Sequence, residues 1–256
     1  MHSSIRPLKA LGQHFLNSNE IAKKIANSLS SDSSYNQVLE IGPGTGVLTE
    51  LLVQNEKKKL FCIEVDGRSV EVLHEKFPQL KTRILHDDFL HASLKELHDE
   101  PFAVIGNFPY NISSQILFRV LAFYERVPEL VGMFQKEVAE RIASGPGSRD
   151  YGILSVLLQA HYDIEYLFTV PPEVFIPPPK VQSGVIRMKL KANHQLKCDP
   201  AFFKKVVKTG FNQRRKTLRN SLKSLLPSDR ENIPYLDKRP EQLHFSQFEE
   251  LAFLLI

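Results

Sequence analysis

The first half of the chain alternates between short strand-like runs and longer segments with helical periodicity. Runs rich in β-branched and other apolar residues predict strands at 38–41, 60–63, 82–85, 102–105 and 130–134. Apolar residues spaced three or four apart predict helices at 47–54, 68–77, 113–124 and 137–142. This order of strand and helix predicts an α/β fold with a Rossmann-like, doubly wound and mostly parallel sheet.

The pattern changes in the second half of the chain. Residues 145–152 have the composition of a loop, and five prolines within 171–179 predict extended or irregular backbone. Alternating polar and apolar residues at 183–190 predict a strand that closes the sheet. The rest of the chain is helical in pattern and basic. We therefore expect a large domain at 1–190 and a small helical domain at 191–256.

Composition narrows the setting in which this fold works. The 256 residues are 42% hydrophobic and 24% charged, as in ordinary folded domains. No apolar run approaches the roughly 20 residues of a membrane-spanning helix, and the first residues lack an apolar signal core. The two cysteines, Cys62 and Cys198, suit a reducing compartment. We expect a cytoplasmic protein that does not bind membranes.

Charge is distributed unevenly between the two predicted domains. Residues 191–256 hold 13 Lys and Arg against 7 Asp and Glu, a net charge of +6, whereas the other 190 residues carry −2. Eight basic residues and no acidic ones fall within 202–223. Clustering of one sign is typical of a surface that binds a polyanion, although a solvated helix face is the simpler alternative.

Three glycines follow the first predicted strand, where a parallel sheet binds its ligands. Gly42, Gly44 and Gly46 let the backbone approach a ligand closely, but a tight turn with no ligand explains them equally well. The neighbouring strand ends favour a ligand. Glu64 ends the second strand and can accept from both hydroxyls of a ribose, and Asp88 follows the third, where it can accept from an adenine amine.

The spacing of these glycines separates the possible cofactors. The pattern is GxGxG and differs from the GxGxxG dinucleotide fingerprint, and no lysine follows as in a phosphate-binding P-loop. Glu40 immediately precedes the loop and suits a cationic ligand better than a pyrophosphate. S-adenosylmethionine carries a sulfonium, an amine, a ribose and an adenine, so it matches the three carboxylates better than NAD does.

A second loop, after the fourth predicted strand, carries the sequence Asn-Phe-Pro-Tyr-Asn-Ile-Ser at 107–113. An Asn-Pro turn before a helix explains the proline and serine alone. The amine of adenine is a poor nucleophile because its lone pair is delocalised into the ring. Hydrogen bonds from that amine to the Asn107 oxygen would localise the lone pair, and Tyr110 would stack on the base. Orientation against an activated methyl donor then supplies much of the catalysis.

Asn107–Tyr110 resembles the (D/N)-P-P-(Y/F) motif of amino-group methyltransferases. Nearly the whole chain resembles the ribosomal RNA adenine N6,N6-dimethyltransferases of the KsgA/RsmA type. The similar segments are KALGQHFL at 9–16, EIGPGTG at 40–46, NFPYNIS at 107–113, FIPPPKVQS at 175–183 and FNQRRKTLRNSL at 211–222. The family usually has leucine where Phe108 stands and often alanine where Gly184 stands, so Phe108 is expected to narrow the pocket.

The resemblance implies S-adenosylmethionine as cofactor and specific roles for residues of this chain. The implied cofactor contacts are His14, Leu16, Gly42, Glu64, Asp88 and Asn107. The implied catalytic residues are Asn107, Pro109, Tyr110 and Phe175, with Phe175 as a second stacking face for the target adenine. The implied substrate is a hairpin loop near the 3′ end of 16S rRNA in the small-subunit precursor, where two adjacent adenines each receive two methyl groups.

The basic tail is the predicted RNA contact. Its expected RNA-binding residues are Lys204, Lys208, Arg214, Arg215, Lys216, Arg219 and Lys223. Apolar residues from Phe203 to Leu225 form a stripe at helical spacing, and Arg214 would fall inside it if the helix were continuous. We therefore expect a break near 210–212 or a buried partner for Arg214.

Other activities stay open at this point. An Erm-type methyltransferase acting on 23S rRNA shares the predicted fold and site, but the segments at 175–183 and 211–222 favour the small-subunit type. A DNA adenine methyltransferase is disfavoured because no DNA-reading module is evident. A non-catalytic ribosome-assembly factor is the alternative from another class. The nine histidines show no metal-binding spacing, so no metal is expected. We expect a monomer with no obligate protein partner.

Overall fold

The computed structural model describes residues 5–30, 34–97, 100–193, 195–227 and 233–255. Its strands are β1 (Phe15–Leu16), β2 (Gln37–Ile41), β3 (Lys59–Glu64), β4 (Ile84–His86), β5 (Phe102–Asn107), β6 (Glu129–Gln135), β7 (Tyr162–Val170), β8 (Phe175–Ile176) and β9 (Ser183–Leu190). Its α-helices are α1 (Asn19–Ala26), α2 (Thr49–Leu52), α3 (Gly67–Lys76), α4 (Ser113–Ala122), α5 (Lys136–Ala143), α6 (Ile153–Gln159), α7 (Pro200–Asn212), α8 (Leu218–Ser221) and α9 (Phe245–Leu254).

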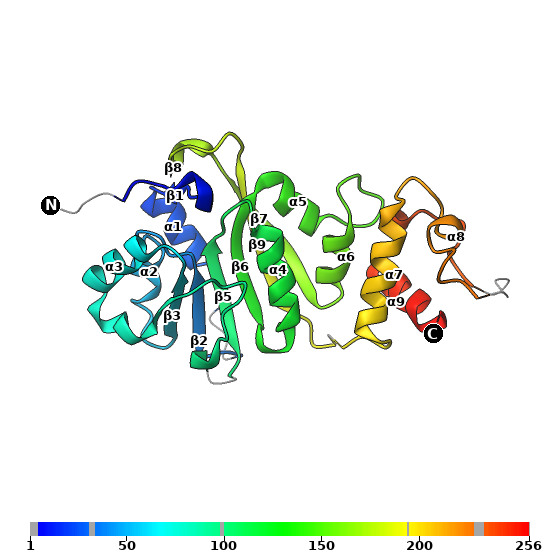
Figure 1. The fold of residues 1–256 in the computed structure, drawn as a ribbon, viewed down its shortest axis with the longest axis horizontal. Coiled ribbons are helices and arrows are strands. Elements are labelled where there is room, and N and C mark those ends of the chain that lie inside the picture. Colours follow the sequence, from blue (N-terminus) through cyan, green and yellow to red (C-terminus); the bar gives the residue numbers. More distant parts are fainter. Residues whose placement is uncertain (1–4, 31–33, 98–99, 194, 228–232, 256) are drawn as a thin grey trace. The chain divides into compact units, whose positions relative to one another are not determined.

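Seven strands form the main sheet in the order β4-β3-β2-β5-β6-β9-β7 (Figure 1). Strands β2 to β6 pair in parallel, and β9 pairs antiparallel with β6. The chain runs outward from β2 to β4 and then returns to β5 on the other side of β2. This reversal creates a crevice at the carboxyl ends of β2 and β5, where open α/β sheets bind ligands. The α/β fold predicted from the sequence is confirmed.

Burial explains which predicted elements formed at the expected places. All residues of β2, and all but the first or last of β3, β5 and β6, are buried, as expected for strands covered on both faces. The third predicted strand begins later than expected because Pro78 starts a 3-10 helix over Pro78–Arg83, which leaves Ile84–His86 as strand β4. The prolines of 171–179 are mostly irregular, but β8 pairs with β1 as a separate two-stranded sheet.

The chain divides into two compact units that differ in one respect from the predicted domains. The first unit holds Met1–Ala139 and Glu165–Leu190, and the second holds Glu140–Ile164 and Lys191–Ile256. The division after Leu190 lies at the expected boundary. Residues 140–164, placed by the sequence in the first domain, group with the tail because α6 packs against α7 and α9. The buried leucines of α6 therefore complete the core of the helical unit.

The helix break expected in the basic tail is present. Helix α7 is capped by Asp199, whose side chain accepts from Phe202 N at 2.7 Å, and it ends at Asn212. Helix α8 begins only at Leu218. Phe203, Val207, Leu218 and Leu222 are buried as the stripe predicts. Arg214 lies between the two helices, where its guanidinium donates to Ser148 O at 3.3 Å and lies 4.0 Å from Glu241.

Candidate functional site

A cavity of about 60 Å³ lies in the first unit at the carboxyl ends of β2, β3 and β5. Its described lining residues are Leu11, Gly12, Gln13, His14, Phe15, Gly42, Gly44, Glu64, Val65, Asn107, Phe108, Pro109 and Tyr110. The predicted residues His14, Gly42, Glu64, Asn107, Pro109 and Tyr110 are thus brought together. Leu16, Asp88 and Phe175 are not among the described residues that line it.

The glycine loop after β2 adopts backbone conformations that favour glycine. Gly42 and Gly44 have φ angles of +66° and +56°. A Cβ atom on Gly44 would lie 2.9 Å from the ring of Phe15, whereas one on Gly42 would meet nothing within 4 Å. The loop therefore needs glycine for its conformation at both positions and for close packing at Gly44, and Gly42 leaves open space beside the cavity.

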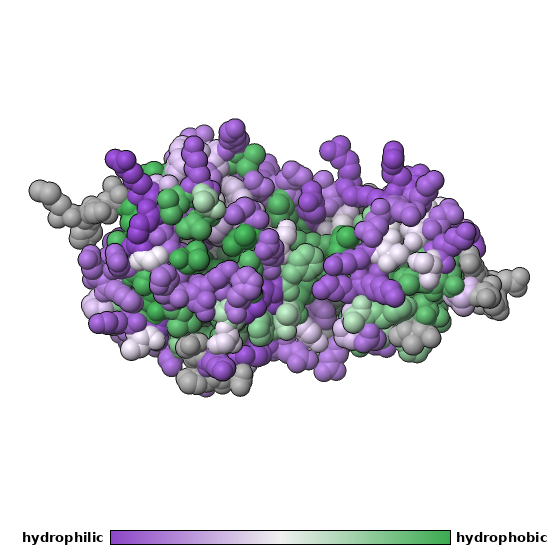
Figure 2. All heavy atoms as spheres, viewed as in Figure 1, coloured by the Kyte–Doolittle hydropathy of each residue, from purple (hydrophilic) through white to green (hydrophobic). Residues whose placement is uncertain are grey.

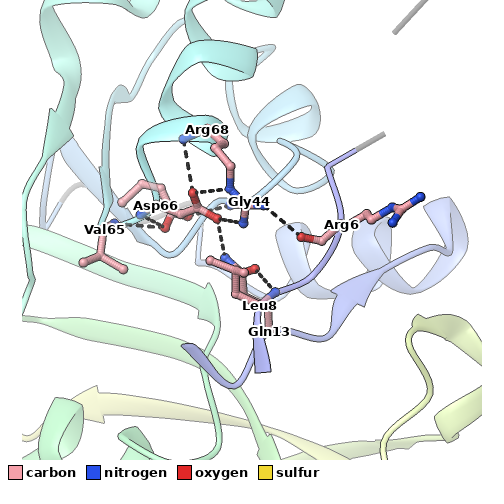
Figure 3. Close-up of polar contacts among 8 residues, drawn as sticks. Arg6, Leu8, Gln13, Gly44, Val65, Asp66 and Arg68 are labelled. Carbon is pink, nitrogen blue, oxygen red and sulfur yellow. Dashed lines mark hydrogen bonds and ion pairs between the residues drawn. The ribbon is translucent and has the colours of Figure 1, made fainter. Parts of the chain in front are cut away.

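Glu64 ends β3 with its carboxylate fixed by three backbone amides. Gly44 N donates to one oxygen at 3.0 Å, and Val65 N and Asp66 N donate to the other at 2.9 Å each (Figure 3). The residue is 5% exposed, and burial raises its pKa despite these bonds. This arrangement holds a rigid acceptor at the cavity wall, which suits a pair of ribose hydroxyls.

Asp88 lies beyond the end of β4 and outside the cavity. Its carboxylate accepts from Leu90 N at 2.9 Å and lies 2.9 Å from His91 Nδ1. The side chain is 41% exposed. A contact of Asp88 with an adenine amine stays a prediction from the resemblance.

Glu40 does not take the position expected from the sequence. It lies inside β2, is 1% exposed, and accepts from Thr49 Oγ1 at 2.7 Å and from Cys62 Sγ at 3.8 Å. Burial raises its pKa to about 7. The expectation that Glu40 faces a cationic ligand is therefore wrong for this structure, because its side chain is directed to Thr49 and Cys62 and it is not among the described cavity residues.

Asn107 ends β5 and presents its amide to the cavity. Its Nδ2 donates to His14 O at 2.9 Å, which fixes the plane of the side chain. This bond uses the nitrogen and leaves the oxygen as an acceptor beside Pro109 and Tyr110, which line the same cavity.

Tyr110 is held at both its hydroxyl and its ring. The hydroxyl lies 2.6 Å from Ser183 Oγ, and the ring stacks on His14 with centroids 5.5 Å apart and planes at 27°. His14 Nδ1 donates to Pro177 O at 2.7 Å, which places a proton on that nitrogen. Partial burial raises the pKa of Tyr110, so the phenol is neutral at physiological pH.

Phe108 is among the described residues that line the cavity, but most of its ring lies in the core. Its ring is 1% exposed and packs edge-on against Phe134, with centroids 5.1 Å apart. Gly106 and Gly132 make room for it, since a Cβ on either glycine would come within 2.6 Å and 2.4 Å of the ring, respectively. The larger side chain is therefore accommodated mainly in the core.

Phe175 does not offer the second stacking face implied by the resemblance. It is 1% exposed, and in the β1–β8 sheet it pairs with Leu16, itself 5% exposed. Both side chains belong to the hydrophobic core of the first unit. Successive side chains of a strand point to opposite faces. Phe175 therefore points into the core, and its exposed neighbour Ile176 points away from it.

Several site residues were missed by sequence reasoning. Gln13 lies within the recognised segment at 9–16 but was given no role, and Asp66 caps α3 two residues after Glu64. An Asp directly before a predicted helix is a recognisable N-cap signal, but its contact with Gln13 joins residues 53 positions apart. Such a contact depends on the tertiary structure.

Most of the predicted RNA-binding residues lie on the surface of the second unit. Lys204, Lys208, Arg215, Lys216 and Lys223 are exposed. Arg219 is also exposed but pairs with Asp237, its Nη2 lying 3.0 Å from Oδ1. Figure 2 shows hydrophilic side chains projecting near the loop between α5 and α6 and near the C-terminal end of α7.

Among the residues that the structure describes, no helix is both long enough and apolar enough to cross a membrane. Within these same residues, no three His, Cys, Asp or Glu side chains gather in a way that could hold a metal ion.

The cavity wall has the chemistry that S-adenosylmethionine requires. Glu64 supplies a fixed acceptor for hydroxyls, and Gly42 leaves the backbone uncovered. The Asn107 oxygen is an acceptor next to the aromatic face of Tyr110. A nucleoside cofactor and a planar base can therefore both find partners at this site.

Comparisons with known proteins identify the family of the chain. The family model described as ribosomal RNA adenine dimethylase matches residues 6–242. A protein of Cytophaga hutchinsonii named ribosomal RNA small subunit methyltransferase A is 55% identical over 98% of each chain. One of the same name from Flavobacterium johnsoniae is 56% identical, over 95% of this chain and 94% of that protein.

Solved structures have the same fold. A dimethyladenosine transferase of Plasmodium falciparum has a TM-score of 0.79 at 24% identity, covering 93% of this chain and 96% of that one. The 23S rRNA methyltransferase ErmE has a TM-score of 0.68 at 25% identity, covering 93% and 99%. With a family model that spans most of its length and relatives above half identity, the chain belongs to the ribosomal RNA adenine dimethylase family, whose cofactor is S-adenosylmethionine.

Proposed function

We propose that this enzyme dimethylates N6 of two adjacent adenines in the 3′-terminal hairpin loop of 16S rRNA, within a small-subunit precursor. The observation that carries the proposal is the cavity in which Asn107, Pro109 and Tyr110 meet Glu64. Relatives named for the small subunit at 52–56% identity support the choice of RNA. We further propose that it acts as a monomer in the cytoplasm.

In this proposal each residue at the site has a distinct task. Glu64 binds the ribose of the cofactor, with Gly42 and His14 as further contacts. The Asn107 oxygen accepts an N6–H of adenine and so localises the nitrogen lone pair, while Nδ2 stays bonded to His14 O. The ring of Tyr110 stacks on the base. The cofactor supplies a methyl group already activated by its sulfonium, so placing the amine in line with it provides much of the rate.

The target base needs a second contact besides Tyr110. His14 stacks on Tyr110 in this structure, so a base that takes the same face must displace or extend that stack. Asp88, Leu16 and Phe175 keep their proposed roles only if the site rearranges around its ligands. In the tail, Lys204, Lys208, Arg214, Arg215, Lys216, Arg219 and Lys223 are proposed to bind phosphates.

The experiment is mass spectrometry of adenines after the protein has reacted with labelled cofactor and unmethylated RNA. Small subunits and large-subunit RNA are supplied in parallel, and the Asn107→Ala variant is the negative control. Four methyl groups on two adjacent adenines of the small subunit are expected. Methylation of 23S rRNA alone would favour the Erm-type activity. This alternative is tested because ErmE has a similar structure. Tight binding without any methylation would favour an assembly factor.

A further inference from the structure

One side of the cofactor cavity is formed by a segment near the N-terminus. This segment, residues 6–15, is called the N-terminal arm, and it contributes Leu11–Phe15 to the described lining. The arm is joined to the two-stranded sheet at Phe15, and Gly12, with φ +62°, provides a turn within the lining segment. The other described lining residues come from the glycine loop, from the end of β3 and from the segment that runs from Asn107 to Tyr110.

A single carboxylate attaches the arm to the loop that carries Glu64. Asp66 Oδ2 accepts from Gln13 Nε2 at 2.9 Å and from Arg68 Nη2 at 2.6 Å (Figure 3). Its other oxygen accepts from Arg68 N at 3.1 Å and Arg68 Nε at 2.9 Å. The bond from the Arg68 amide caps α3, and the other three bonds join the carboxylate to the side chains of Gln13 and Arg68.

The arm is braced at two more points by the same group of residues. Gln13 Oε1 accepts from Leu8 N at 2.8 Å, and Arg68 Nη1 donates to Arg6 O at 3.2 Å. Asp66 itself is 6% exposed, and the Arg68 guanidinium with Gln13 holds its pKa at about 2. The carboxylate is therefore ionised at every working pH, and its bonds to Gln13 and Arg68 are charge-assisted.

The arm forms one wall of a pocket that is partly open to solvent. A ligand that enters or leaves past this wall depends on where the arm lies. Side-chain hydrogen bonds of Gln13 and Arg68 hold the arm in its present position.

We propose that Asp66, acting through Gln13 and Arg68, is a positioning residue that holds the N-terminal arm closed over the cofactor pocket and thereby sets how fast the cofactor enters and leaves. This rests on the proposed binding of S-adenosylmethionine at Glu64. Asp66 N also donates to Glu64, so the carboxylate that closes the arm belongs to the same turn as the acceptor that binds the ribose.

The Asp66→Asn variant separates this role from helix capping. Asparagine is as good an N-cap as aspartate, so α3 keeps its cap. The amide nitrogen that it introduces, however, would face the donors Gln13 Nε2 and Arg68 Nη2. Adding Gln13→Glu to the same protein restores the hydrogen bond between positions 13 and 66 with donor and acceptor exchanged. The new carboxylate at position 13 accepts from the amide nitrogen at position 66 and still accepts from Leu8 N.

The experiment compares the natural protein with two single variants, Asp66→Asn and Gln13→Ala, and with the double variant Asp66→Asn/Gln13→Glu. The control is Asp199→Asn, which alters the cap of α7 in the other unit. Amide hydrogen exchange over residues 6–15 is measured without ligand. Dissociation of tritiated cofactor is followed by chase, and KM for the cofactor and kcat are measured separately.

We expect both single variants to speed arm exchange and cofactor dissociation by about tenfold, as loss of a charge-assisted hydrogen bond predicts. KM for the cofactor rises by more than kcat at saturation falls, while the double variant recovers most of the loss. Unchanged exchange in Asp66→Asn and Gln13→Ala, or no recovery in the double variant, overturns the proposal. Exchange in the free protein tests the arm even if cofactor proves to bind away from Glu64.

Discussion

The cofactor cavity and the basic tail differ in how far their charged groups are buried. In the cavity, Glu64 is 5% exposed and each of its oxygens accepts from at least one backbone amide. In the tail, Arg215, Lys216 and Lys223 are exposed. A buried and fixed group is irreplaceable, because its partners lose their bonds when it is removed. Exposed charges act together, so each one matters little and salt weakens them all.

The largest effect is expected at the group proposed to contact the reacting amine. Asn107→Ala removes the acceptor for N6–H, and the rate of methyl transfer at saturation should fall by roughly a hundred- to a thousandfold, as for other positioned polar groups. Cofactor and RNA should still bind. Single-turnover rates and equilibrium binding give the two values.

Asn111→Ala is the matched control for this change, because it alters an exposed asparagine of the same loop that is not among the described cavity residues. It should keep a rate close to that of the natural protein. A near-normal rate in Asn107→Ala would show that the amine is activated by some other group.

Glu64→Ala tests the same cavity through the cofactor. Hydrogen bonds to a charged group contribute about 1.5–3 kcal/mol, so the affinity for S-adenosylmethionine should fall by about ten- to a hundredfold. RNA binding should change little. Calorimetric titration measures the first and filter binding the second, with the exposed acid Glu71→Ala on α3 as control. Unchanged calorimetric affinity in Glu64→Ala would remove this residue from the site.

The elements found from sequence are those whose burial follows a local pattern. Strands β2, β3, β5 and β6 are almost wholly buried and read as continuous apolar runs. Strand β7 was missed because its nine residues are mostly half-buried or exposed. Strands β1 and β8 have two residues each, too few for any periodicity, and they form only because the two segments meet.

The site shows the same limit. Glu64 could be assigned because it is the last residue of its strand, where a side chain reaches the ligand crevice. Glu40 precedes the last residue of β2, and its side chain meets Thr49 of the following helix instead. Sequence order alone does not reveal that difference. The burial of Phe175 depends likewise on its pairing with Leu16, far away in the chain.

The basic tail should show a smaller and salt-dependent effect. Neutralising Arg215, Lys216 and Arg219 together should flatten the dependence of log affinity on log salt by up to about 2 units, at roughly 0.7–0.9 per phosphate contact. Arg219 should contribute least, because Asp237 already pairs with it. Filter binding of small subunits across a salt series measures the slope.

A matched control neutralises three exposed lysines of the first unit, Lys23, Lys57 and Lys81. It removes the same number of positive charges outside the tail. This control should leave the slope nearly unchanged. Parallel lines of equal affinity for the tail variant and the natural protein would identify the tail as solvated surface.

The smallest effect concerns Glu40, a buried carboxylate with no assigned contact to ligand. Its pKa is raised to about 7 by burial, whereas it lies near the usual 4.5 once the chain unfolds. Between these two values the folded protein binds more protons than the unfolded one, so stability falls as pH rises through this window. Below pH 4.5 and above pH 7 this contribution is constant, and Glu64, whose pKa is also raised, acts in the same direction.

Glu40→Gln keeps an oxygen that accepts from Thr49 and removes the ionisation. Relative to the natural protein, the variant should gain about 2–3 kcal/mol between pH 5 and pH 8, since about two pH units of this window lie below the folded pKa and each unit corresponds to about 1.4 kcal/mol. Urea unfolding of both proteins at the two pH values measures this difference. If the stability of the variant and that of the natural protein depended on pH in the same way, Glu40 would be ionised in the folded protein throughout this range. Its bonds to Thr49 and Cys62 would then offset the cost of burying its charge.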